Sequence, residues 1–215
     1  MTSRHPSTAL LRAYATGAAP FGASLAVASH LTYCPSCRSQ VAEAEAVAGA
    51  LLTNDEARAD APEFASLEAL LDINESEVAI AAPPAAPARD AGPLPRPVAD
   101  AIGCSFDDIP WRFRLPGVYE YEFAAEDGET ISLLKVRPGS RIPQHTHTAE
   151  ELTVVFDGEL IDGDNRFGVG DVSVADGEVD HDPRAGEGRD CICLAVLSGG
   201  LHFTGPFSRA LNLFT

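Results

Sequence analysis

Basic residues are scarce in this chain of 215 residues. Lysine and arginine total 15 against 32 aspartates and glutamates, which gives a formal net charge of −17. Proteins that bind nucleic acid gain most of their affinity by neutralising phosphates with basic side chains. The charge balance therefore argues against direct binding to DNA or RNA.

Long hydrophobic runs are also absent from the sequence. The apolar stretch from Cys191 to Leu197 has seven residues, whereas a helix that spans a bilayer needs roughly 20. The N-terminal residues MTSRHP lead into an amphipathic pattern and show neither the apolar core nor the cleavage site of a secretory signal. We therefore expect a cytoplasmic protein that does not insert into a membrane.

The cysteines are five, an odd number. A secreted disulfide framework is typical of a shorter chain with an even number of cysteines. In a reducing compartment, cysteines serve instead as metal ligands or remain free thiols. We interpret the cysteines of this chain in that second way.

Residues 1–80 show helical periodicity. Ser7 is a suitable N-cap for a helix that ends at Gly17, and further helices are expected at 20–31, 35–53 and 64–71. A helical module of this size is small enough to need a stabilising element such as a metal ion. Residues 81–98 are rich in proline and alanine, with six prolines between positions 81 and 97, and predict an extended linker between two domains.

Residues 99–215 change to the alternating pattern of β-strands. Turn signals such as Asp-Gly separate the alternating segments. Six short strands are expected, at 111–115, 118–123, 130–136, 151–156, 169–174 and 191–197. Many short strands at this spacing are typical of an antiparallel barrel or sandwich. The predicted fold class is therefore α+β and multidomain: a small N-terminal helical bundle followed by an antiparallel β-barrel.

A first candidate metal site lies in the helical module. The segment from His30 to Cys37 has the pattern His-x3-Cys-x2-Cys. Pro35 turns the chain between the two thiolates and His30 lies one helical turn before Cys34, so three ligands can meet at one zinc ion. The fourth ligand is expected to be His5, the only other His or Cys before position 104. The alternatives are a redox-active cysteine pair, whose usual setting is a βαβ unit, and an ordinary surface role for His30.

A second candidate metal site lies among the expected strands. Residues 139–158 follow the pattern Gly-x5-His-x-His-x3-Glu-x6-Gly, with His145, His147 and Glu151 as ligands. Histidines two positions apart on a strand point to the same face. His181 is the expected fourth ligand, and the alternative is an exposed histidine in an acidic loop. Three imidazoles and one carboxylate suit Zn, Fe, Mn or Ni.

Two further cysteines lie on a late strand. Cys191 and Cys193 alternate with Ile192 and Leu194, so both thiols point to one face. They are either small buried apolar residues or redox thiols that face the barrel interior near the metal and can be oxidised.

Both metal patterns resemble those of known families. Residues 139–158 match the first cupin motif at every defined position. The second cupin motif is degenerate, because Gly170 and His181 keep its spacing while Asp176, Glu178 and Ala185 replace the usual Pro, Gly and Asn. The His-x3-Cys-x2-Cys pattern with an upstream His is similar to the zinc-binding anti-sigma domain. A fusion of the two resembles the ChrR-type anti-sigma factors.

This resemblance implies a regulatory function rather than an enzymatic one. Proteins of this group bind an extracytoplasmic-function (ECF, group IV) sigma factor, normally one to one, through the N-terminal module. They release it upon stress from singlet oxygen or organic hydroperoxides, a response that needs the cupin. The resemblance implies one zinc ion in the helical module and a second metal ion in the cupin. The second ion is expected to be zinc, and Mn or Fe are the alternatives.

Two other functions remain open at this point. One is a metal-dependent cupin enzyme, such as a dioxygenase, with the helical module as an accessory. The other is a zinc-stabilised interaction module fused to a structural cupin. The regulatory function accounts for both metal patterns and for the linker, whereas the enzymatic one gives the helical module no role.

Overall fold

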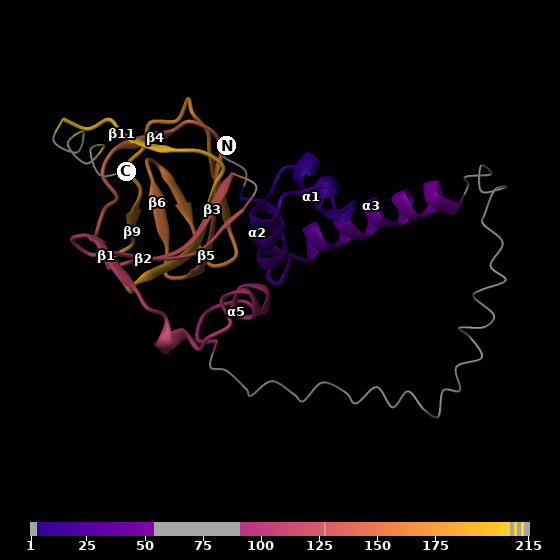
Figure 1. The fold of residues 1–215 in the computed structure, drawn as a ribbon, viewed down its shortest axis with the longest axis horizontal. Coiled ribbons are helices and arrows are strands. Elements are labelled where there is room, and N and C mark those ends of the chain that lie inside the picture. The colour runs from indigo at the N-terminus through magenta and orange to yellow at the C-terminus, as the bar shows by residue number, and fades with distance from the viewer. Residues whose placement is uncertain (1–3, 54–90, 127, 207–208, 210–211, 213–215) are drawn as a thin grey trace.

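The computed structural model describes residues 4–53, 91–126, 128–206, 209 and 212, which form a group of helices beside a β-barrel (Figure 1). The helix expected at 64–71 and the linker residues 81–90 lie outside the described residues. In the described part of the chain, no helix is both long enough and apolar enough to cross a membrane.

The N-terminal part consists of α1 (Thr8–Ala15), α2 (Phe21–Leu31) and α3 (Pro35–Thr53). The hydroxyl of Ser7 accepts a hydrogen bond from the backbone N–H of Leu10 and so caps α1. Helix α3 begins at Pro35, where the missing N–H of proline costs no intrahelical hydrogen bond. The helices share a small core of Leu11, Val27, Cys37 and Val41.

The barrel is built from antiparallel strands in three sheets. The largest sheet has the order β1 (Arg112–Leu115), β2 (Val118–Glu126), β3 (Glu129–Val136), β10 (Cys191–Leu197), β5 (Glu151–Asp157), β8 (Val172–Ala175). The second has the order β7 (Asn165–Phe167), β6 (Leu160–Asp162), β9 (Arg184–Ala185), and the third pairs β11 (Leu201–Phe203) with β4 (His145–His147). This combination of N-terminal helices and an antiparallel barrel is the predicted fold class.

Two short elements lead into the barrel: α5 (Arg96–Ile102) and the 3-10 helix η2 (Phe106–Asp108). Helix α5 includes the last residues of the expected linker. Its Val98 is fully buried in the same apolar cluster as α2 and the outer face of the six-stranded sheet. The chain therefore contacts the sheet before the first strand begins.

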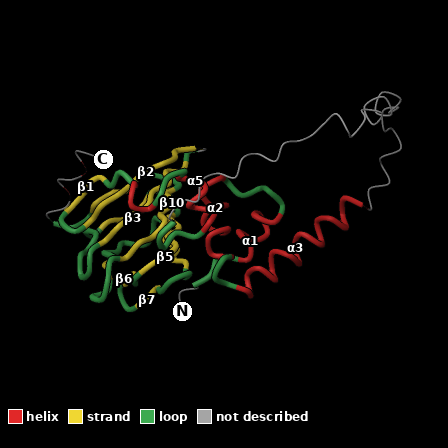
Figure 2. The backbone as a smooth tube through the Cα atoms, turned by 90° about the horizontal axis from the view of Figure 1, so that it is seen from below, coloured by secondary structure: helices red, strands yellow, loops and turns green. Residues whose placement is uncertain are grey.

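Helix α2 lies against the outer face of the six-stranded sheet (Figure 2). Seven of its 11 residues are buried. The side that meets the sheet carries Ala23, Leu25 and Ala26. Two of these are alanines, and short side chains let a helix approach a sheet closely. Helix α2 therefore contributes both to the small helical core and to the apolar cluster on the outer face of the six-stranded sheet.

The side chains of β10 point alternately to the two faces of the six-stranded sheet. Ile192, Leu194 and Val196 belong to the apolar cluster that includes α2. The alternate residues Cys191 and Cys193 belong to the cluster inside the barrel. The side-chain period of two therefore places both cysteines in the barrel interior.

Candidate metal centres

His5, His30, Cys34 and Cys37 converge where the three N-terminal helices meet. His5 precedes α1, His30 lies in the last turn of α2, Cys34 in the turn that follows, and Cys37 in the first turn of α3. Each residue offers one ligand atom, and the four atoms lie within 4.8 Å of one another. The structure thus brings together all four residues predicted for the first metal site.

The spacing of these atoms fits a tetrahedral zinc ion. Zn–N bonds of about 2.05 Å and Zn–S bonds of about 2.3 Å place two nitrogens about 3.3 Å apart, and a nitrogen and a sulfur about 3.6 Å apart. His5 Nδ1 lies 3.3 Å from His30 Nε2, 3.5 Å from Cys34 Sγ and 3.6 Å from Cys37 Sγ. His30 Nε2 and Cys37 Sγ are 3.3 Å apart. Donor types and dimensions therefore both fit zinc.

Burial sets the protonation of this cluster. It lowers the pKa of His30, which leaves a neutral imidazole able to bind a metal. Burial, with Cys34 as a neighbour, raises the pKa of the Cys37 thiol to about 11. A buried thiol of this kind ionises readily only beside a cation, and a zinc ion bound here would supply that charge.

His145, His147, Glu151 and His181 converge inside the barrel. Strand β4 carries the first two histidines, β5 begins at Glu151, and His181 forms an isolated β-bridge with His145. The four ligand atoms again lie within 4.8 Å of one another. His145 Nε2 is 3.1 Å from His181 Nε2, and His147 Nε2 is 3.3 Å from Glu151 Oε2. All four residues predicted for the second site are thus placed together.

Two of these histidines are oriented by hydrogen bonds from their outer ring nitrogens. His145 Nδ1 donates to the carbonyl of Pro143 over 2.8 Å, and His181 Nδ1 donates to Asp162 Oδ2 over 2.8 Å. Burial opposes a charge on His181, but Asp162 outweighs it and raises the pKa of that imidazole. Each Nε2 is thereby left facing the centre of the cluster, as is usual for metal-binding histidines.

The remaining two residues show why this cluster needs a cation. Both ring nitrogens of the buried His147 have no hydrogen-bond partner. Burial lowers the pKa of His145 and of His147 to about 4, and it raises the pKa of Glu151 to about 7. A buried neutral imidazole without a partner, as at His147, is unfavourable beside the Glu151 carboxyl group unless a positive ion lies between them. The donors fit a divalent metal such as Zn, Fe or Mn.

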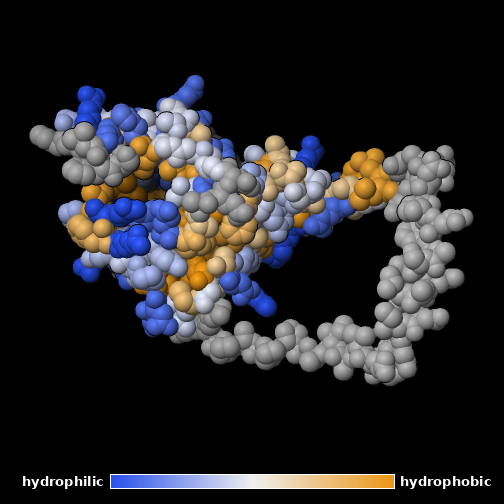
Figure 3. All heavy atoms as spheres, viewed as in Figure 1, coloured by the Kyte–Doolittle hydropathy of each residue, from blue (hydrophilic) through white to orange (hydrophobic). Residues whose placement is uncertain are grey.

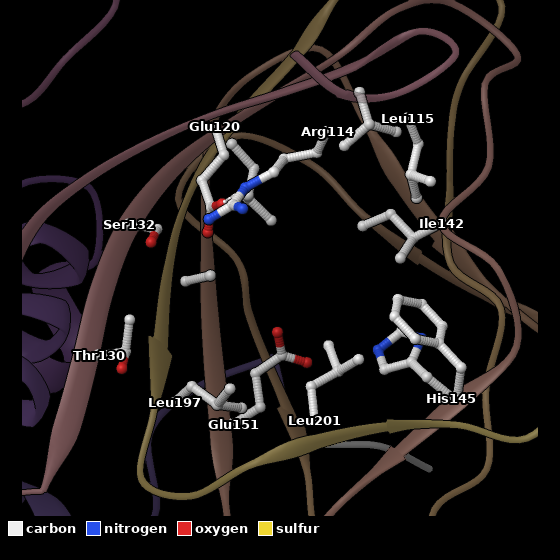
Figure 4. Close-up of a pocket in the computed structure, with 14 residues that line it drawn as sticks. Arg114, Leu115, Glu120, Thr130, Ser132, Ile142, His145, Glu151, Leu197 and Leu201 are labelled. Atoms are coloured by element: carbon white, nitrogen blue, oxygen red, sulfur yellow. Dashed lines mark hydrogen bonds and ion pairs between the residues drawn. The ribbon is translucent and has the colours of Figure 1, made fainter. Parts of the chain in front are cut away.

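A cavity of about 430 Å³ lies beside His145 and Glu151 (Figure 4). Its wall is mostly apolar and includes Leu115, Val118, Leu134, Ile142, Ala195, Leu197, Leu201 and Phe203. At the end remote from the metal ligands, the guanidinium of Arg114 pairs with the carboxylate of Glu120. Because the Arg114 side chain is half exposed, the cavity reaches the surface, and small molecules can approach the metal ligands.

Cys191 and Cys193 share one face of β10, as their alternation predicted, and the structure places both thiols inside the barrel. Cys193 lines a smaller hollow together with His145, Glu151 and His181. A hydrogen bond with Cys191, together with burial, raises the pKa of Cys193 well above its ordinary value. Because the thiolate is the reactive form, this setting places sulfur beside the metal ligands yet slows its reaction with oxidants.

Sequence reasoning missed two residues that hold metal ligands in place. Asp162 belongs to one of the Asp-Gly turn signals, and its carboxylate also orients His181. Gly170 supplies the backbone carbonyl that accepts a hydrogen bond from His30 Nδ1 over 2.6 Å. A backbone acceptor 140 positions from its donor leaves no signal in the sequence.

Fold and side-chain clusters together define a cupin protein with an N-terminal helical module that carries a His and Cys cluster able to hold a metal ion. The family described as the ChrR cupin-like domain matches residues 99–199. The anti-sigma-E factor ChrR of Cereibacter sphaeroides is 41% identical over 218 residues, which cover 100% of this chain and 99% of that protein. The chain therefore belongs to the ChrR family of anti-sigma factors, and the resemblance inferred from the sequence is confirmed.

A solved structure of a ChrR protein shows the same relationship. The crystal structure of Rhodobacter sphaeroides SigE in complex with the anti-sigma ChrR matches with a TM-score of 0.76 and 32% identity, covering 92% of this chain and 99% of that one. A cupin protein of Ralstonia eutropha JMP134 matches at 27% identity with a TM-score of 0.43, covering 47% of this chain and 71% of that one. The first match extends over the helices as well as the barrel.

Proposed function

We propose that this protein is a cytoplasmic anti-sigma factor that binds one ECF sigma factor and releases it under oxidative stress. The full-length likeness to a ChrR chain that was crystallised in complex with SigE carries this proposal. We assign sigma binding to the helical module, residues 1–80, and the response to the cupin, residues 99–215. In this division the N-terminal cluster holds a structural zinc ion, and the cupin holds zinc, with Mn or Fe as alternatives.

Helix α3 offers an apolar surface to the sigma factor. Val47, Leu51 and Leu52 are 59%, 70% and 75% exposed, and the far end of α3 is visibly apolar (Figure 3). A groove of about 350 Å³ runs between α1 and α3, and Val47 and Leu51 line it. Contiguous exposed apolar residues usually mark a binding surface, and an amphipathic helix of the partner fits such a groove.

The cupin metal site is suited to meet a small oxidant. Two of its ligands, His145 and Glu151, border the cavity that reaches the surface. Singlet oxygen and organic hydroperoxides can react there with a histidine ligand, with the metal or with the nearby thiol of Cys193. Any such change releases the sigma factor only if it lowers the affinity of the complex, because a signal shifts an equilibrium through a difference in free energy between two states.

Co-expression with an ECF sigma factor tests this function. We expect a one-to-one complex after purification, and release of the sigma factor on exposure to singlet oxygen or a hydroperoxide. The variants His145→Ala and His181→Ala should keep the complex and lose the release. His202→Ala is the matched control, because His202 is exposed and lies opposite Thr146 on the neighbouring strand, outside the ligand cluster. Release at the wild-type rate in both ligand variants would remove the cupin metal site from the response.

A metal-dependent cupin enzyme is a second candidate function, favoured by the cavity beside the metal ligands. It predicts Fe or Mn in the cupin and turnover of a small molecule that enters the cavity. Zinc in both sites, together with a stable sigma complex, argues for the regulator. Metal analysis of the purified complex separates the two.

A further inference from the structure

Helix α2 is hydrogen-bonded to the barrel at both of its ends. At its start, the backbone N–H of Gly22 donates to Glu129 Oε2 over 2.8 Å, and Glu129 is only 5% exposed. At its end, His30 Nδ1 donates to the carbonyl of Gly170 over 2.6 Å. The second contact matters chemically, because the other ring nitrogen of His30 belongs to the N-terminal metal cluster.

The turn that presents the Gly170 carbonyl is itself fixed to the barrel. The N–H of Gly170 donates to the carbonyl of Val155 over 2.8 Å, and the N–H of Val155 donates to the carbonyl of Asp171 over 3.2 Å. Val155 lies in β5, which is paired with β10 on one side and with β8 on the other in the six-stranded sheet. The acceptor for His30 is therefore part of the rigid barrel framework.

The same turn touches the helical module at two other points. The N–H of Val172 donates to the carbonyl of Arg4 over 3.0 Å, one residue before His5. A Cβ atom on Gly170 would lie only 2.6 Å from Cβ of Tyr33, one residue before Cys34. The turn thus contacts the chain beside two further ligands of the cluster.

We propose that the barrel positions the ligands of the N-terminal zinc site, with Glu129 and Gly170 as positioning residues that act through α2 and His30. A hydrogen bond from the outer nitrogen of a histidine ligand fixes its tautomer and ring orientation, and loss of such a bond typically lowers metal affinity about 10- to 100-fold. In this protein the acceptor belongs to the other half of the chain. Retention of zinc by the helical module therefore depends on contact with the cupin. This inference rests on the zinc site proposed above and is independent of sigma binding.

Substitution of Gly22 separates the two halves without touching a metal ligand. In Gly22→Ala the new Cβ would lie 2.6 Å from Val196 Cγ1, 2.8 Å from Glu129 Oε2 and 3.1 Å from Ile131 Cδ1. The methyl group raises the helix propensity at this position, but its close contacts should push α2 away from the sheet. Gly49→Ala is the matched control, because a Cβ there meets nothing within 4 Å. Glu129→Ala removes the acceptor for Gly22, whereas Glu129→Gln keeps an oxygen acceptor and should rescue the contact.

The measurement uses the full-length protein loaded with Co²⁺ in place of zinc. Of the two ligand clusters found among the described residues, only the N-terminal one contains cysteines, so the thiolate-to-cobalt charge-transfer band reports that site. The band is followed in excess chelator, far below the melting temperature of each variant. We expect Gly22→Ala and Glu129→Ala to lose the band about 10- to 100-fold faster than the wild type. Gly49→Ala and Glu129→Gln should match the wild type.

The outcomes distinguish this inference from the function proposed above. A wild-type protein without a thiolate-to-cobalt band would contradict the N-terminal metal site itself. If the wild type shows the band and Gly22→Ala and Glu129→Ala lose it no faster than the wild type does, the positioning role of the barrel is refuted. If both variants fail to fold, Tyr33→Ala decides in their place. Tyr33 is 38% exposed, so its removal spares the core but loosens the contact with Gly170. If Tyr33→Ala loses the cobalt band at the same rate as the wild type, the inference is refuted as well.

Discussion

Replacement of two leucines on α3 tests whether this helix is the docking surface for a sigma factor. The variant Leu51→Gln/Leu52→Gln keeps side chains of similar length and good helix propensity. Because the two leucines are 70% and 75% exposed, the free protein loses little burial, and its melting temperature should stay close to that of the wild type.

The expected loss of affinity follows from the exposed area. Full burial of a leucine side chain contributes about 1.5–3 kcal/mol. With 70% and 75% of these residues still available for burial, each contributes about 1–2 kcal/mol if the partner covers it. The pair then accounts for about 2–4 kcal/mol, and the Kd of the complex should rise about 30-fold to several hundred-fold.

Titration of the purified variant with a fluorescently labelled sigma factor measures this change. Phe113→Gln is the matched control, because Phe113 is 64% exposed but lies on β1 of the barrel. It should bind with wild-type affinity. Equal affinity for the α3 variant and the wild type would exclude this end of α3 from the interface. A larger loss of affinity in Phe113→Gln than in the α3 variant would indicate that the sigma factor binds to the barrel instead.

Three further predictions concern the metal sites and the thiols. Cys37→Ser should abolish metal binding at the N-terminal cluster and reduce helicity, measured by metal analysis and circular dichroism, because metal binding and folding are coupled in small modules; full helicity without metal would contradict a structural zinc ion. Asp162→Asn should weaken metal binding in the cupin about 10- to 100-fold, because it replaces the carboxylate that orients His181; calorimetry should show this change, with the N-terminal site unaffected. Cys191 and Cys193 should react with iodoacetamide far more slowly in the folded protein than after unfolding, since a hydrogen bond with Cys191 and burial raise the pKa of Cys193. Rapid alkylation of the native protein, detected by mass spectrometry, would show that the barrel exposes these thiols.

Regular patterns in the sequence predicted some of the elements that carry the two sites, but β4, which holds His145 and His147, was not among the six expected strands. The structure places a helix at Pro35–Thr53 and a strand at Cys191–Leu197, the ranges given by apolar periodicity. The strand expected to begin at residue 169 begins instead at Val172. The reason is local, because Gly170 has a φ of 87° and turns the chain before the strand starts.

The contact between the halves could not be predicted in the same way. Periodicity shows that a helix has a buried face, but it does not show which surface covers that face. In α2, residues on two faces are buried, Val27 against the other helices and Ala26 against the sheet. The run of small residues around Gly22 is equally consistent with a weakly packed helix, so its close approach to Glu129 emerges only in three dimensions.

The Gly170 turn restricts how freely these two halves can be exchanged with those of other proteins. A φ of 87° suits the end of a barrel loop, and the missing Cβ also leaves room for Tyr33 of the helical module. A different cupin grafted behind these helices would have to present a glycine at this turn, with its carbonyl aimed at His30. A graft that lacked it would fold as a barrel yet carry a helical module with an ill-oriented ligand. Chimeras built at the proline-rich segment are therefore expected to work only when the donor barrel brings its own equivalent of this turn.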